Sequence, residues 1–484
     1  MWDILSAYWP HILGFVSLAL TVVAASHAAM TKDDVRAAIG WVGVIVLSPI
    51  IGSLVYAVGG INRIRRASIA SQRRQTLAYP LAQTFEVSDA EVAGDVGRRF
   101  AALKTLGDKA TRRHLKTGNA IAVLRTGDEA YAAMIAAIAA AERSVILETY
   151  IFDRDPLGLR VADALIAAHE RGVAVRVLID AVGARYSVPS IVGYLQKGGV
   201  PVDVFNGNII IGLRLPYANL RTHRKLLIAD GRIAFAGGMN IRRGFTTEFA
   251  GEAAGHDTHF RIEGPVVEDL FGVAAEDWRF ASGEELTGDT WTVTPEAARQ
   301  GPTVLMRAVA SGPDASLETN HKLLIGAFSV ARESIRIMSP YFLPDRELIS
   351  ALVTAARRGV AIDIVVPDVN NLVLVDRAMR AQFDQVLKDG CRIWRATGSF
   401  DHSKLLAIDG TWAYVGSSNL DARSLRLNFE IDLEVLDQGF ARRIEQRIDA
   451  AISGAHPVTL KELRARPFPL RLLDRMLWLC SPYL

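Results

Sequence analysis

Two stretches of the sequence share a pattern of residues that can do chemistry. The first is HRKLLIADGRIAFAGGMN, from His223 to Asn240, and the second is HSKLLAIDGTWAYVGSSN, from His402 to Asn419. Both contain His-x-Lys, four residues, Asp, six residues, and then two small residues, any residue and Asn. Imidazole can act as a nucleophile or a general acid near neutral pH, and Lys supplies a positive point charge. The pattern therefore indicates two half-sites for a reaction at an anionic group.

The spacing within each copy brings these groups together. Residues two apart in a strand point to the same face, so the His and the Lys of each copy project together. The Asp-Gly pair predicts a turn, and the strand after it returns the small residues and the Asn toward the His and the Lys. The candidate site residues are His223, Lys225, Asp230, Asn240, His402, Lys404, Asp409, Ser417 and Asn419.

Two such half-sites facing each other would surround one phosphate. Lys charges and the neutral donors of Asn and Ser can hold its oxygens. One neutral His can attack the phosphorus, while one protonated His gives the leaving alcohol its proton. Carboxylates would hold the rings in the right tautomer. We expect no metal and no cofactor, because the Lys cations take the place that metal ions fill in many phosphoryl-transfer sites.

One copy of the pattern alone would be weak evidence, since a half-buried His and an edge-strand Lys are common in ordinary strands. The two copies are offset by the same 179 residues throughout (402 − 223 and 419 − 240), which favours a shared site. The pair His321-Lys322 lacks both the intervening residue and the downstream Asp, and we interpret it as a surface pair on a helix.

The elements around the two copies repeat as well, which predicts a duplicated α/β fold. SVILETYIFD, GLRVADALIAAHERGV and AVRVLID are typical of strand, helix and strand, and SIRIMSPYF, DRELISALVTAARRGV and AIDIVVPD repeat that order. Such units build a mostly parallel sheet covered by helices. We expect two tandem α/β/α units, over residues 116–300 and 301–455, with a shared central site.

Two uncharged runs predict a pair of membrane-spanning helices over residues 1–62. No Asp, Glu, Lys or Arg occurs over residues 4–31 or 37–62. Each run is long enough to cross a hydrocarbon core of ~30 Å as a helix. A cleaved signal peptide fits the first run less well, because its start has no basic residue and a second run follows at once.

The segments that flank the body predict its side of the membrane. Residues 63–115 begin with five arginines before the first acidic residue, Glu86, so we expect a basic, cytoplasmic juxtamembrane segment. Both chain ends and the body should then be cytoplasmic. Residues 456–484 form an amphipathic tail with Leu472, Met476 and Leu479 on one helical face. This tail either lies on the membrane interface or packs on the body as a terminal helix.

The composition argues against several classes of protein. Half of the 484 residues are hydrophobic and the mean hydropathy is +0.19, which is apolar for a soluble enzyme. The net charge of +3 lacks the dense basic face of a nucleic-acid-binding protein, so we expect no nucleic-acid partner. The two cysteines, Cys391 and Cys480, have no ligand-spaced Cys or His nearby, which argues against a disulfide scaffold or a zinc site.

At these motifs the chain resembles the phospholipase D superfamily, whose signature is H-x-K-x4-D-x6-G-S-x-N, the HKD motif. The second copy matches throughout, and the first departs once, with Gly238 in place of Ser. Bacterial cardiolipin synthases commonly carry that Gly and are similar in their paired apolar segments. The stretches LETYIF, RIEGPVV, SPYFLPD and NLDARSLRLNFE agree as well.

The resemblance implies a reaction and its residues. The reaction is phosphatidyl transfer between two phosphatidylglycerol molecules, giving cardiolipin and glycerol through a phosphatidyl-histidine. His223 would be the nucleophile and His402 the general acid and then base, with the Lys and Asn residues around the phosphate. Asp230 and Asp409 would orient the histidines. The implied location is the bacterial cytoplasmic membrane, spanned more than once.

Two other functions remain open at this point. The first is a membrane-tethered phosphodiesterase of the same superfamily, acting on lipid or nucleic acid, because the chemistry is shared up to the intermediate and only the acceptor differs. The second is a non-catalytic membrane scaffold. The complete sets of His, Lys and Asp argue against the scaffold, and the missing basic, aromatic-lined groove argues against a nuclease.

Overall fold

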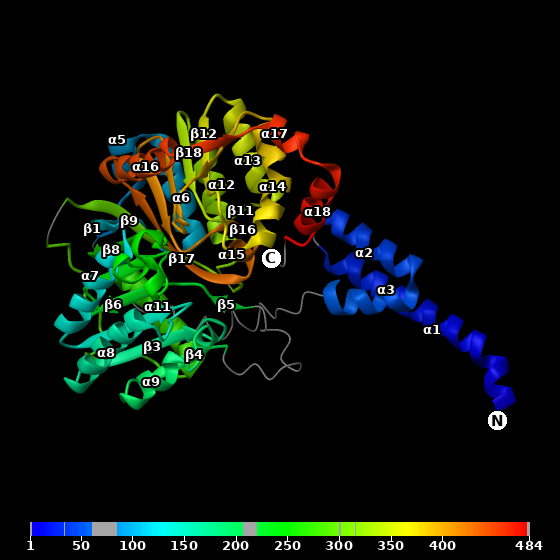
Figure 1. Ribbon diagram of the computed structural model, residues 1–484, viewed down its shortest axis with the longest axis horizontal. Coiled ribbons are helices and arrows are strands. Elements are labelled where there is room, and N and C mark those ends of the chain that lie inside the picture. The colour runs from blue at the N-terminus through cyan, green and yellow to red at the C-terminus, as the bar shows by residue number, and fades with distance from the viewer. Residues whose placement is uncertain are drawn as a thin grey trace. The chain divides into compact units, whose positions relative to one another are not determined.

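The chain forms two compact units, Met1–Arg65 and Arg66–Leu484 (Figure 1). A computed structural model describes residues 2–32, 34–60, 85–206, 220–299, 302–314 and 316–481. The arginines at 63–74, on which the expected cytoplasmic side depends, lie outside the described residues. The two units are therefore described separately.

Among its described residues, the first unit contains one helix that is long enough to cross a membrane. Helix α1 covers Trp2–Thr31, and its stretch Tyr8–Thr31 has the required length and apolar composition. Helix α2, Val35–Leu47, begins where the Asp34 side chain accepts hydrogen bonds from two backbone N–H groups. Helix α3, Pro49–Val55, follows and ends in a wider turn, η1, over Tyr56–Gly60.

The expectation of a second continuous membrane-spanning helix over residues 37–58 is wrong. The backbone leaves the helical conformation at Ser48, with φ −143° and ψ 77°. Pro49 follows and has no N–H to donate to a helix that would continue through it. Helix α2 has 13 residues and is about 20 Å long at 1.5 Å per residue, which is shorter than a hydrocarbon core of ~30 Å.

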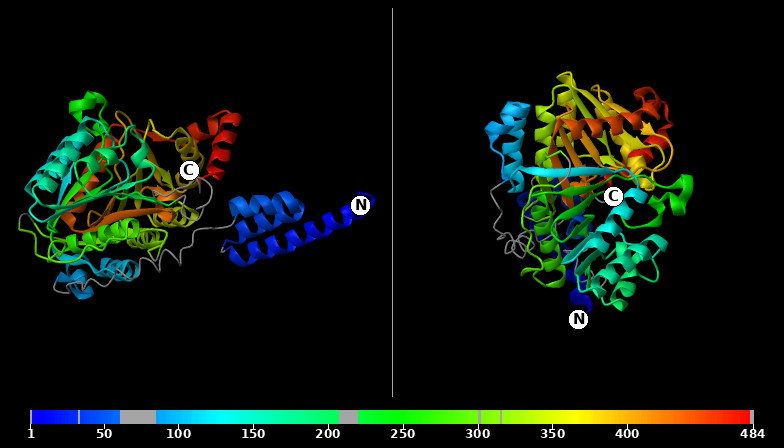
Figure 2. Two further views of the ribbon diagram at one scale, coloured as in Figure 1. Left: turned by 90° about the horizontal axis from the view of Figure 1, so that it is seen from below. Right: turned by 90° about the vertical axis from the view of Figure 1, so that its left-hand side faces the viewer.

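Helix α3 instead turns back along α1 and α2 (Figure 2). A Cβ at Gly52 would lie 2.3 Å from the Val44 carbonyl oxygen, so only glycine permits this close approach. The Tyr56 hydroxyl lies 2.8 Å from His27 Nδ1, and the Lys32 ammonium contacts the Gly60 carbonyl. The segment that ends at Gly60 therefore lies beside the last turn of α1. Helices α2 and α3 together form a short hairpin.

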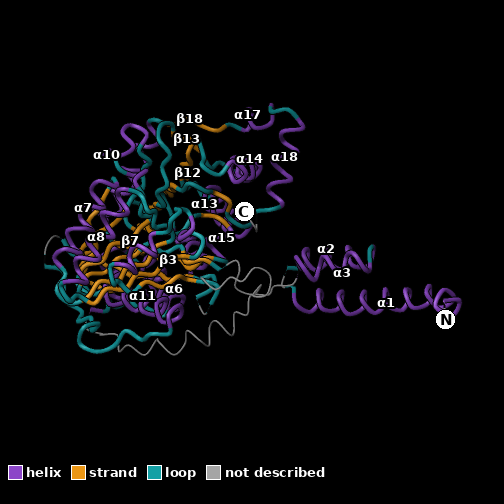
Figure 3. Tube along the Cα trace, turned by 60° about the horizontal axis from the view of Figure 1, so that its bottom comes forward, coloured by secondary structure: helices purple, strands orange, loops and turns teal. Residues whose placement is uncertain are grey.

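The second unit is built on one large mixed sheet, with helices on its faces (Figure 3). The strands of its first half are β1 (Lys116–Leu124), β2 (Ser144–Thr149), β3 (Ala174–Asp180), β4 (Val202–Phe205), β5 (Arg221–Thr222), β6 (Leu226–Ala229), β7 (Ile233–Gly237) and β8 (His259–Glu263). The strands of its second half are β9 (Val304–Ser311), β10 (Ser334–Met338), β11 (Phe342–Leu343), β12 (Ala361–Pro367), β13 (Arg392–Ala396), β14 (Leu405–Ile408), β15 (Trp412–Gly416), β16 (Leu420–Asp421), β17 (Asn428–Leu436) and β18 (Ala455–Val458).

Helices and short 3₁₀ turns connect these strands. The helices are α5 (Asp89–Val96), α6 (Arg98–Thr111), α7 (Gly127–Ala140), α8 (Pro156–Glu170), α9 (Ile191–Lys197), α10 (Thr247–Ala250), α11 (Val266–Ser282), α12 (Thr319–Val330), α13 (Arg346–Arg357), α14 (Val373–Leu387), α15 (Ala422–Arg426), α16 (Gln438–Ser453), α17 (Leu460–Ala465) and α18 (Phe468–Leu479). The 3₁₀ turns are η4 (Gly183–Arg185), η5 (Arg243–Phe245) and η6 (Gly251–Ala253).

The strand order shows the internal repeat. It runs β18-β13-β12-β10-β14-β15-β17-β9-β1-β8-β7-β6-β2-β3-β4, and β5 pairs with β17. Parallel β2, β3 and β4 adjoin antiparallel β6, β7 and β8, and the second half repeats this with β10, β12, β13 and β14, β15, β17. The expected α/β fold with two repeated halves is confirmed. The expectation of a mostly parallel sheet is wrong, because each half adds a set of antiparallel strands to its parallel ones. The halves join through β9, which pairs with both β17 and β1.

Local sequence explains why these elements form where they do. Strand β2, whose centre is the apolar run Val145–Leu147, is buried along its whole length because it lies inside the sheet between β3 and β6. The Asp155 side chain accepts a hydrogen bond from the Gly158 N–H and so begins α8, with Pro156 in the first turn. Asp345 begins α13 in the same way, by accepting from the Leu348 N–H.

The described part of the expected juxtamembrane segment, residues 85–115, is folded onto the second half of this unit. Ser88 and Glu91 form a capping box at the start of α5. Arg99 of α6 contacts the Asp409 carboxylate, and Asp108 accepts a hydrogen bond of 2.5 Å from Arg307 of β9. Residues 85–115 are thus part of the folded body, and the boundary expected at residue 116 does not separate them from it.

The C-terminal tail packs on the body through α18. Asp474 is buried and lies 2.5 Å from Arg466 and 3.4 Å from Arg377 of α14. Leu477 and Trp478 pack against the core of the second half. The face of α18 that contains Asp474, Leu477 and Trp478 therefore packs on the body, which was one of the two interpretations of the tail. Other apolar residues of the helix stay exposed.

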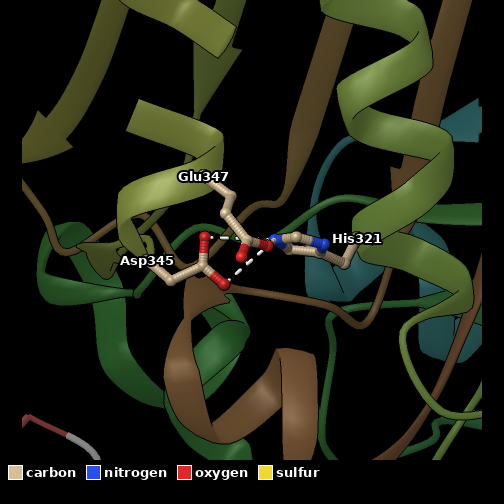
Figure 4. Close-up of side chains that lie close together, drawn as sticks. All are labelled: His321, Asp345 and Glu347. Atoms are coloured by element: carbon tan, nitrogen blue, oxygen red, sulfur yellow. Dashed lines mark hydrogen bonds and ion pairs between the residues drawn. The ribbon is translucent and has the colours of Figure 1, made fainter. Parts of the chain in front are cut away.

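His321 is not the surface residue that the sequence suggested. It is buried, and its Nε2 lies 2.9 Å from Asp345 and 3.3 Å from Glu347, which connects α12 to the start of α13 (Figure 4). The hydrogen bond to Asp345 raises the pKa of His321, although burial opposes it. The three side chains are near enough to share a metal ion, but Arg426 lies 3.4 Å from Asp345 and disfavours a second cation there.

The short hairpin predicts a topology that labelling can test. We expect Tyr8→Cys and Gly59→Cys, each in a Cys480→Ser background, to react with a membrane-impermeant maleimide from opposite sides. The reason is that α1 would cross the membrane once, while α2 and α3 would return to the side on which α1 ends. Reaction of both cysteines from the same side would require a second crossing and would contradict this topology.

The His321 ion pair predicts how stability depends on pH. Since the folded-state pKa of His321 is raised, its contribution to stability is fully present below its unfolded-state pKa of ~6.5. That contribution is lost as the pH rises through the folded-state value. We therefore expect the melting-temperature difference between wild type and His321→Gln to shrink as the pH increases from 6 to 9. Tryptophan fluorescence of the solubilised full chain can follow the unfolding.

The control for this series is His456→Gln, because His456 is an exposed histidine that lies 3.4 Å from Asp368. We expect this variant to melt close to wild type at each pH. A melting difference for His321→Gln that stays constant or grows toward pH 9 would show that its ion pair does not stabilise the fold in the expected way.

Candidate active site

Both motif copies lie on the walls of one cavity of about 1030 Å³ in the second unit. His223 and Asn240 of the first copy line it, together with His402 and Asn419 of the second. Residues 179 positions apart (402 − 223) thus face one space. The cavity is large enough to accept a drug-sized molecule, and therefore a phosphate with its substituents.

Each histidine is held by the backbone of the opposite half. The His223 N–H follows β5 and donates 2.8 Å to the carbonyl of Phe429 in β17. The His402 N–H donates 2.7 Å to the carbonyl of His256. The two imidazoles can therefore reach their positions only when both halves have folded together.

A buried carboxylate of the opposite half binds each imidazole. His223 Nδ1 lies 3.0 Å from Glu430 Oε2, and His402 Nδ1 lies 2.9 Å from Asp257 Oδ2. This assigns the ring proton to Nδ1 and leaves the Nε2 lone pair available for reaction. The rings of Tyr150 and Tyr341 meet His223 and His402 edge to face, at 5.1 and 6.1 Å between centroids. The rings are thus fixed in both tautomer and direction.

The expectation that Asp230 and Asp409 orient the histidines is wrong. The Asp230 carboxylate accepts from the backbone N–H groups of residues 142–144 at 2.7–3.2 Å. Asp409 accepts from those of residues 332–334 at 2.8–2.9 Å. Both residues adopt the left-handed conformation, with φ of 53° and 51°. These carboxylates instead connect the turn in each motif to the start of the neighbouring strand, β2 or β10, which runs antiparallel to the motif strand.

Ser417 contacts a carboxylate, and it is not among the residues that line the cavity. Its hydroxyl donates 2.6 Å to Glu430 Oε2 and accepts from the Ile431 N–H at 2.9 Å. The expected direct contact of Ser417 with a substrate is therefore not supported, because both hydrogen-bonding directions of the hydroxyl are already used. Ser417 orients the carboxylate that binds His223.

The departure at Gly238 has a physical reason in the other half-site. A Cβ at position 238 would lie 2.4 Å from Asp257 Oδ1, so a serine could not fit beside that carboxylate. Asp257 is one carbon shorter than Glu430, and its carboxylate is supported by the Thr258 N–H at 2.8 Å. The two half-sites therefore hold a carboxylate against a histidine in two ways. One uses Gly238 beside Asp257, and the other uses Ser417 beside Glu430.

The two motif lysines are buried just behind the histidines. Lys225 Nζ donates 2.6 Å to the His223 carbonyl, and Lys404 Nζ lies 2.8 Å from His402 Nδ1. Burial lowers the pKa of Lys225 to about 7 and that of Lys404 to about 8, and the charges of Glu430 and Asp257 oppose this. An anion nearby would stabilise the charged form of both lysines.

The imidazoles are neutral at neutral pH. Burial, followed by the charge of Lys404, lowers the pKa of His402 to about 4, although Asp257 opposes the shift. Burial and the neighbouring lysines also bring the pKa of His223 well below its usual range. A neutral imidazole is the form that can act as a nucleophile.

The two motif asparagines offer amide groups to the cavity. Asn240 Oδ1 accepts 3.2 Å from the Ile151 N–H, which leaves its –NH₂ group to donate elsewhere. Asn419 Oδ1 is buried and has no hydrogen-bond partner among the described residues. Both asparagines can therefore contact a ligand directly.

Sequence reasoning missed several groups that form this site. Glu430 and Asp257, which each follow a motif copy, were not recognised. Glu430 is the last residue of NLDARSLRLNFE, and Asp257 lies just before RIEGPVV, two stretches that agree with the superfamily. The charged residues on the cavity walls outside the motifs were also missed: Asp153, Arg154, Asp155, Arg221, Arg242, Arg243, Asp421 and Arg423. These residues follow no repeated spacing that a single sequence reveals.

Comparison with known proteins agrees with this geometry. The family model described as "Cardiolipin synthase, PLD-like domain" matches residues 134–252 and 324–452, once in each half. The chain is 30% identical to a cardiolipin synthase of Alkalihalophilus pseudofirmus, over 92% of this chain and 88% of that protein. It is 31% identical to cardiolipin synthase A of Yersinia pseudotuberculosis, over 98% of each.

A solved structure shares the fold. The crystal structure of phosphatidylserine synthase from Haemophilus influenzae superposes with a TM-score of 0.60 at 16% identity, covering 79% of this chain and all of that one. The family model and the relatives, which extend over nearly the whole sequence, show that the chain belongs to the cardiolipin synthase family of the phospholipase D superfamily.

Proposed function

We propose that the chain is a phosphatidyltransferase that converts two phosphatidylglycerol molecules into cardiolipin and glycerol. The observation that carries this proposal is the shared cavity, in which two imidazoles from different halves each bind a buried carboxylate. The names of the relatives support the same reaction. The alternative is hydrolysis of the same intermediate, which would make the chain a membrane-tethered phosphodiesterase.

The first step forms a covalent intermediate. Nε2 of neutral His223 attacks the phosphorus, the bond from phosphorus to the glycerol head-group oxygen breaks, and protonated His402 gives that oxygen its proton. His402 gains its proton once the anionic phosphodiester lies beside it, because the added negative charge raises the pKa of the ring. Asp257 then stabilises the imidazolium through Nδ1.

The second step transfers the phosphatidyl group. Neutral His402 accepts a proton from a head-group hydroxyl of a second phosphatidylglycerol, and the oxygen of that hydroxyl attacks the phosphorus. The bond to His223 breaks and the ring returns to its neutral form. The two motif asparagines, which line the cavity, would hold the non-bridging oxygens, and the positive charges of Lys225 and Lys404 behind the histidines would stabilise the charge that develops there. Water must be excluded from the intermediate, because its hydrolysis would give phosphatidic acid.

Membrane anchoring suits this reaction. Both substrates are confined to a bilayer, so an enzyme tethered there meets them at a higher effective concentration. We propose that α1 anchors the chain in the bacterial cytoplasmic membrane. The arginine-rich sequence after residue 62 supports a cytoplasmic location for the second unit, by the positive-inside rule.

A product assay tests the proposal. The purified full chain is incubated in vesicles with phosphatidylglycerol that carries separate labels in the acyl chains and the head-group glycerol. We expect labelled cardiolipin and free glycerol in equal amounts. His223→Ala and His402→Ala should each lower turnover by at least ~10²-fold, because each removes a proton-transfer or nucleophilic group.

The matched control in that assay is His456→Ala, an exposed histidine outside the cavity, which should keep wild-type turnover. Phosphatidic acid as the only lipid product would support the hydrolase instead. Substantial activity in either cavity variant would show that the two histidines do not share the roles assigned to them.

The carboxylates predict a separation of activity from stability. Glu430→Gln and Asp257→Asn should lower kcat by ~10²-fold or more with little change in KM, because they keep the shape but lose the charge that stabilises each imidazolium. Asp230→Asn should instead lower the free energy of unfolding by roughly 1–3 kcal/mol, since it weakens the hydrogen bonds to three backbone N–H groups, with kcat of the folded fraction retained. Kinetics and thermal unfolding of each variant give both values. A kcat loss in Asp230→Asn as large as that in Glu430→Gln would contradict these assignments.

A further inference from the structure

Exposed large apolar side chains have an uneven distribution over the second unit. Among its described residues they occur in three segments only. The first segment is a loop, the second is the loop into α14 with the first turn of that helix, and the third is α18. The side chains are Tyr186 and Val188, then Val369, Leu372, Val373 and Leu374, then Phe468, Leu470, Leu472, Leu473, Met476 and Leu479.

All three segments meet at the cavity that contains the histidines. Tyr186 lines that cavity, as does Leu372. Ser481, two residues after the end of α18, lines it as well. Helix α18 lies against α14 (Figure 1), and buried Asp474 of α18 forms an ion pair with half-buried Arg377 of α14. We call residues 185–188, 369–374 and 468–479 the apolar rim, because together they border the cavity that a substrate must enter.

The exposed charges of the apolar rim all have one sign. Arg185, Arg471 and Arg475 are exposed, whereas Asp474, the one acidic residue in the rim, is buried between two arginines. Apolar side chains interspersed with exposed arginines are typical of surfaces that enter the head-group region of an anionic bilayer. Burial of the single acid leaves no exposed carboxylate in the rim to repel such lipids.

We propose that the apolar rim docks the mouth of the active-site cavity onto an anionic bilayer, so that lipid phosphates enter the site while their acyl chains stay in the membrane. The inference rests on the proposed function in one respect, namely that the substrate is a lipid. It adds a second contact with the membrane that is independent of α1. Val373 and Leu374 at the start of α14 and the exposed side of α18 would enter the bilayer beside the cavity.

Kinetics with two forms of one substrate test the docking. The full chain is assayed with phosphatidylglycerol in vesicles and with a short-chain phosphatidylglycerol below its critical micelle concentration. We expect Val373→Glu and Met476→Glu to lower kcat/KM at least tenfold for vesicles and less than twofold for the dispersed substrate. Both side chains are largely exposed, at 65% and 58%, so the substitutions should leave the fold intact. Ala140→Glu, at the exposed end of α7, is the control and should change neither value.

Equal losses on both substrates, or no loss on vesicles, would overturn the proposal. A wild-type chain that gives no product from either form of lipid would instead contradict the proposed function. A fluorophore at position 480 would then still test the docking, because its emission can be measured without enzymatic activity.

Cys480 ends α18 and is exposed, whereas Cys391 is buried, so an environment-sensitive fluorophore can be attached at position 480 alone. In vesicles of phosphatidylglycerol and phosphatidylcholine we expect a blue-shifted emission that lipids with a quencher on the upper acyl chain suppress. The control carries the fluorophore at Ala140→Cys in a Cys480→Ser background and should remain unquenched. Equal solvent exposure of the fluorophore at both sites would overturn the proposal. A blue shift at position 480 that grows with the amount of protein per vesicle would also overturn it, because it would indicate contact with a second copy of the chain.

Discussion

The hydrogen bonds that cross between the two halves are the constraint on which the rest of the structure depends. Glu430 of the second half binds His223 of the first, and Asp257 of the first half binds His402 of the second. Backbone hydrogen bonds cross in the same way, from His223 to Phe429 and from His402 to His256. Neither half can complete its own site. The continuous sheet through β17, β9 and β1 fixes the register in which the two half-sites meet, and this explains why the repeated halves remain in one chain and one compact unit.

Burial gives these groups their chemical character. Both motif lysines have lost most of their water, and their pKa values are lowered for that reason. The same burial raises the pKa of Glu430 and makes both imidazoles neutral. A phosphate that enters the cavity restores the balance, because its negative charge stabilises the lysines and draws a proton onto His402. The site is therefore electrostatically suited to an anion, and in the proposed mechanism substrate binding would produce the protonation state that the first step requires.

The sequence predicted the parts of this arrangement that depend on spacing. The duplicated α/β fold and the meeting of the two copies at one cavity follow from the strand–helix pattern and from the repeat. His223 and Lys225 do lie together, but they are in the link between β5 and β6 and not in the strand that the spacing predicted. The carboxylate partners could not be predicted in this way, because Glu430 and Asp257 act across the halves at positions set by sheet register. Asp230 was misassigned because its backbone partners lie far away in the sequence. The break at Ser48 shows the limit of composition, since an uncharged run of sufficient length need not be one helix. The sequence predicted only the α18 part of the apolar rim, because the amphipathic pattern of residues 456–484 does not show which loops lie beside that helix at the cavity.

The most direct test of the central claim is to identify the residue that carries the covalent intermediate. Wild-type chain is mixed with acyl-labelled phosphatidylglycerol, quenched within one turnover under conditions that preserve phosphohistidine, digested and analysed by mass spectrometry. The account predicts a phosphatidyl group on the peptide that contains His223, and loss of this adduct in both His223→Ala and Glu430→Gln. An adduct on His402, on another residue or on none, at a time when product is already forming, would contradict the account.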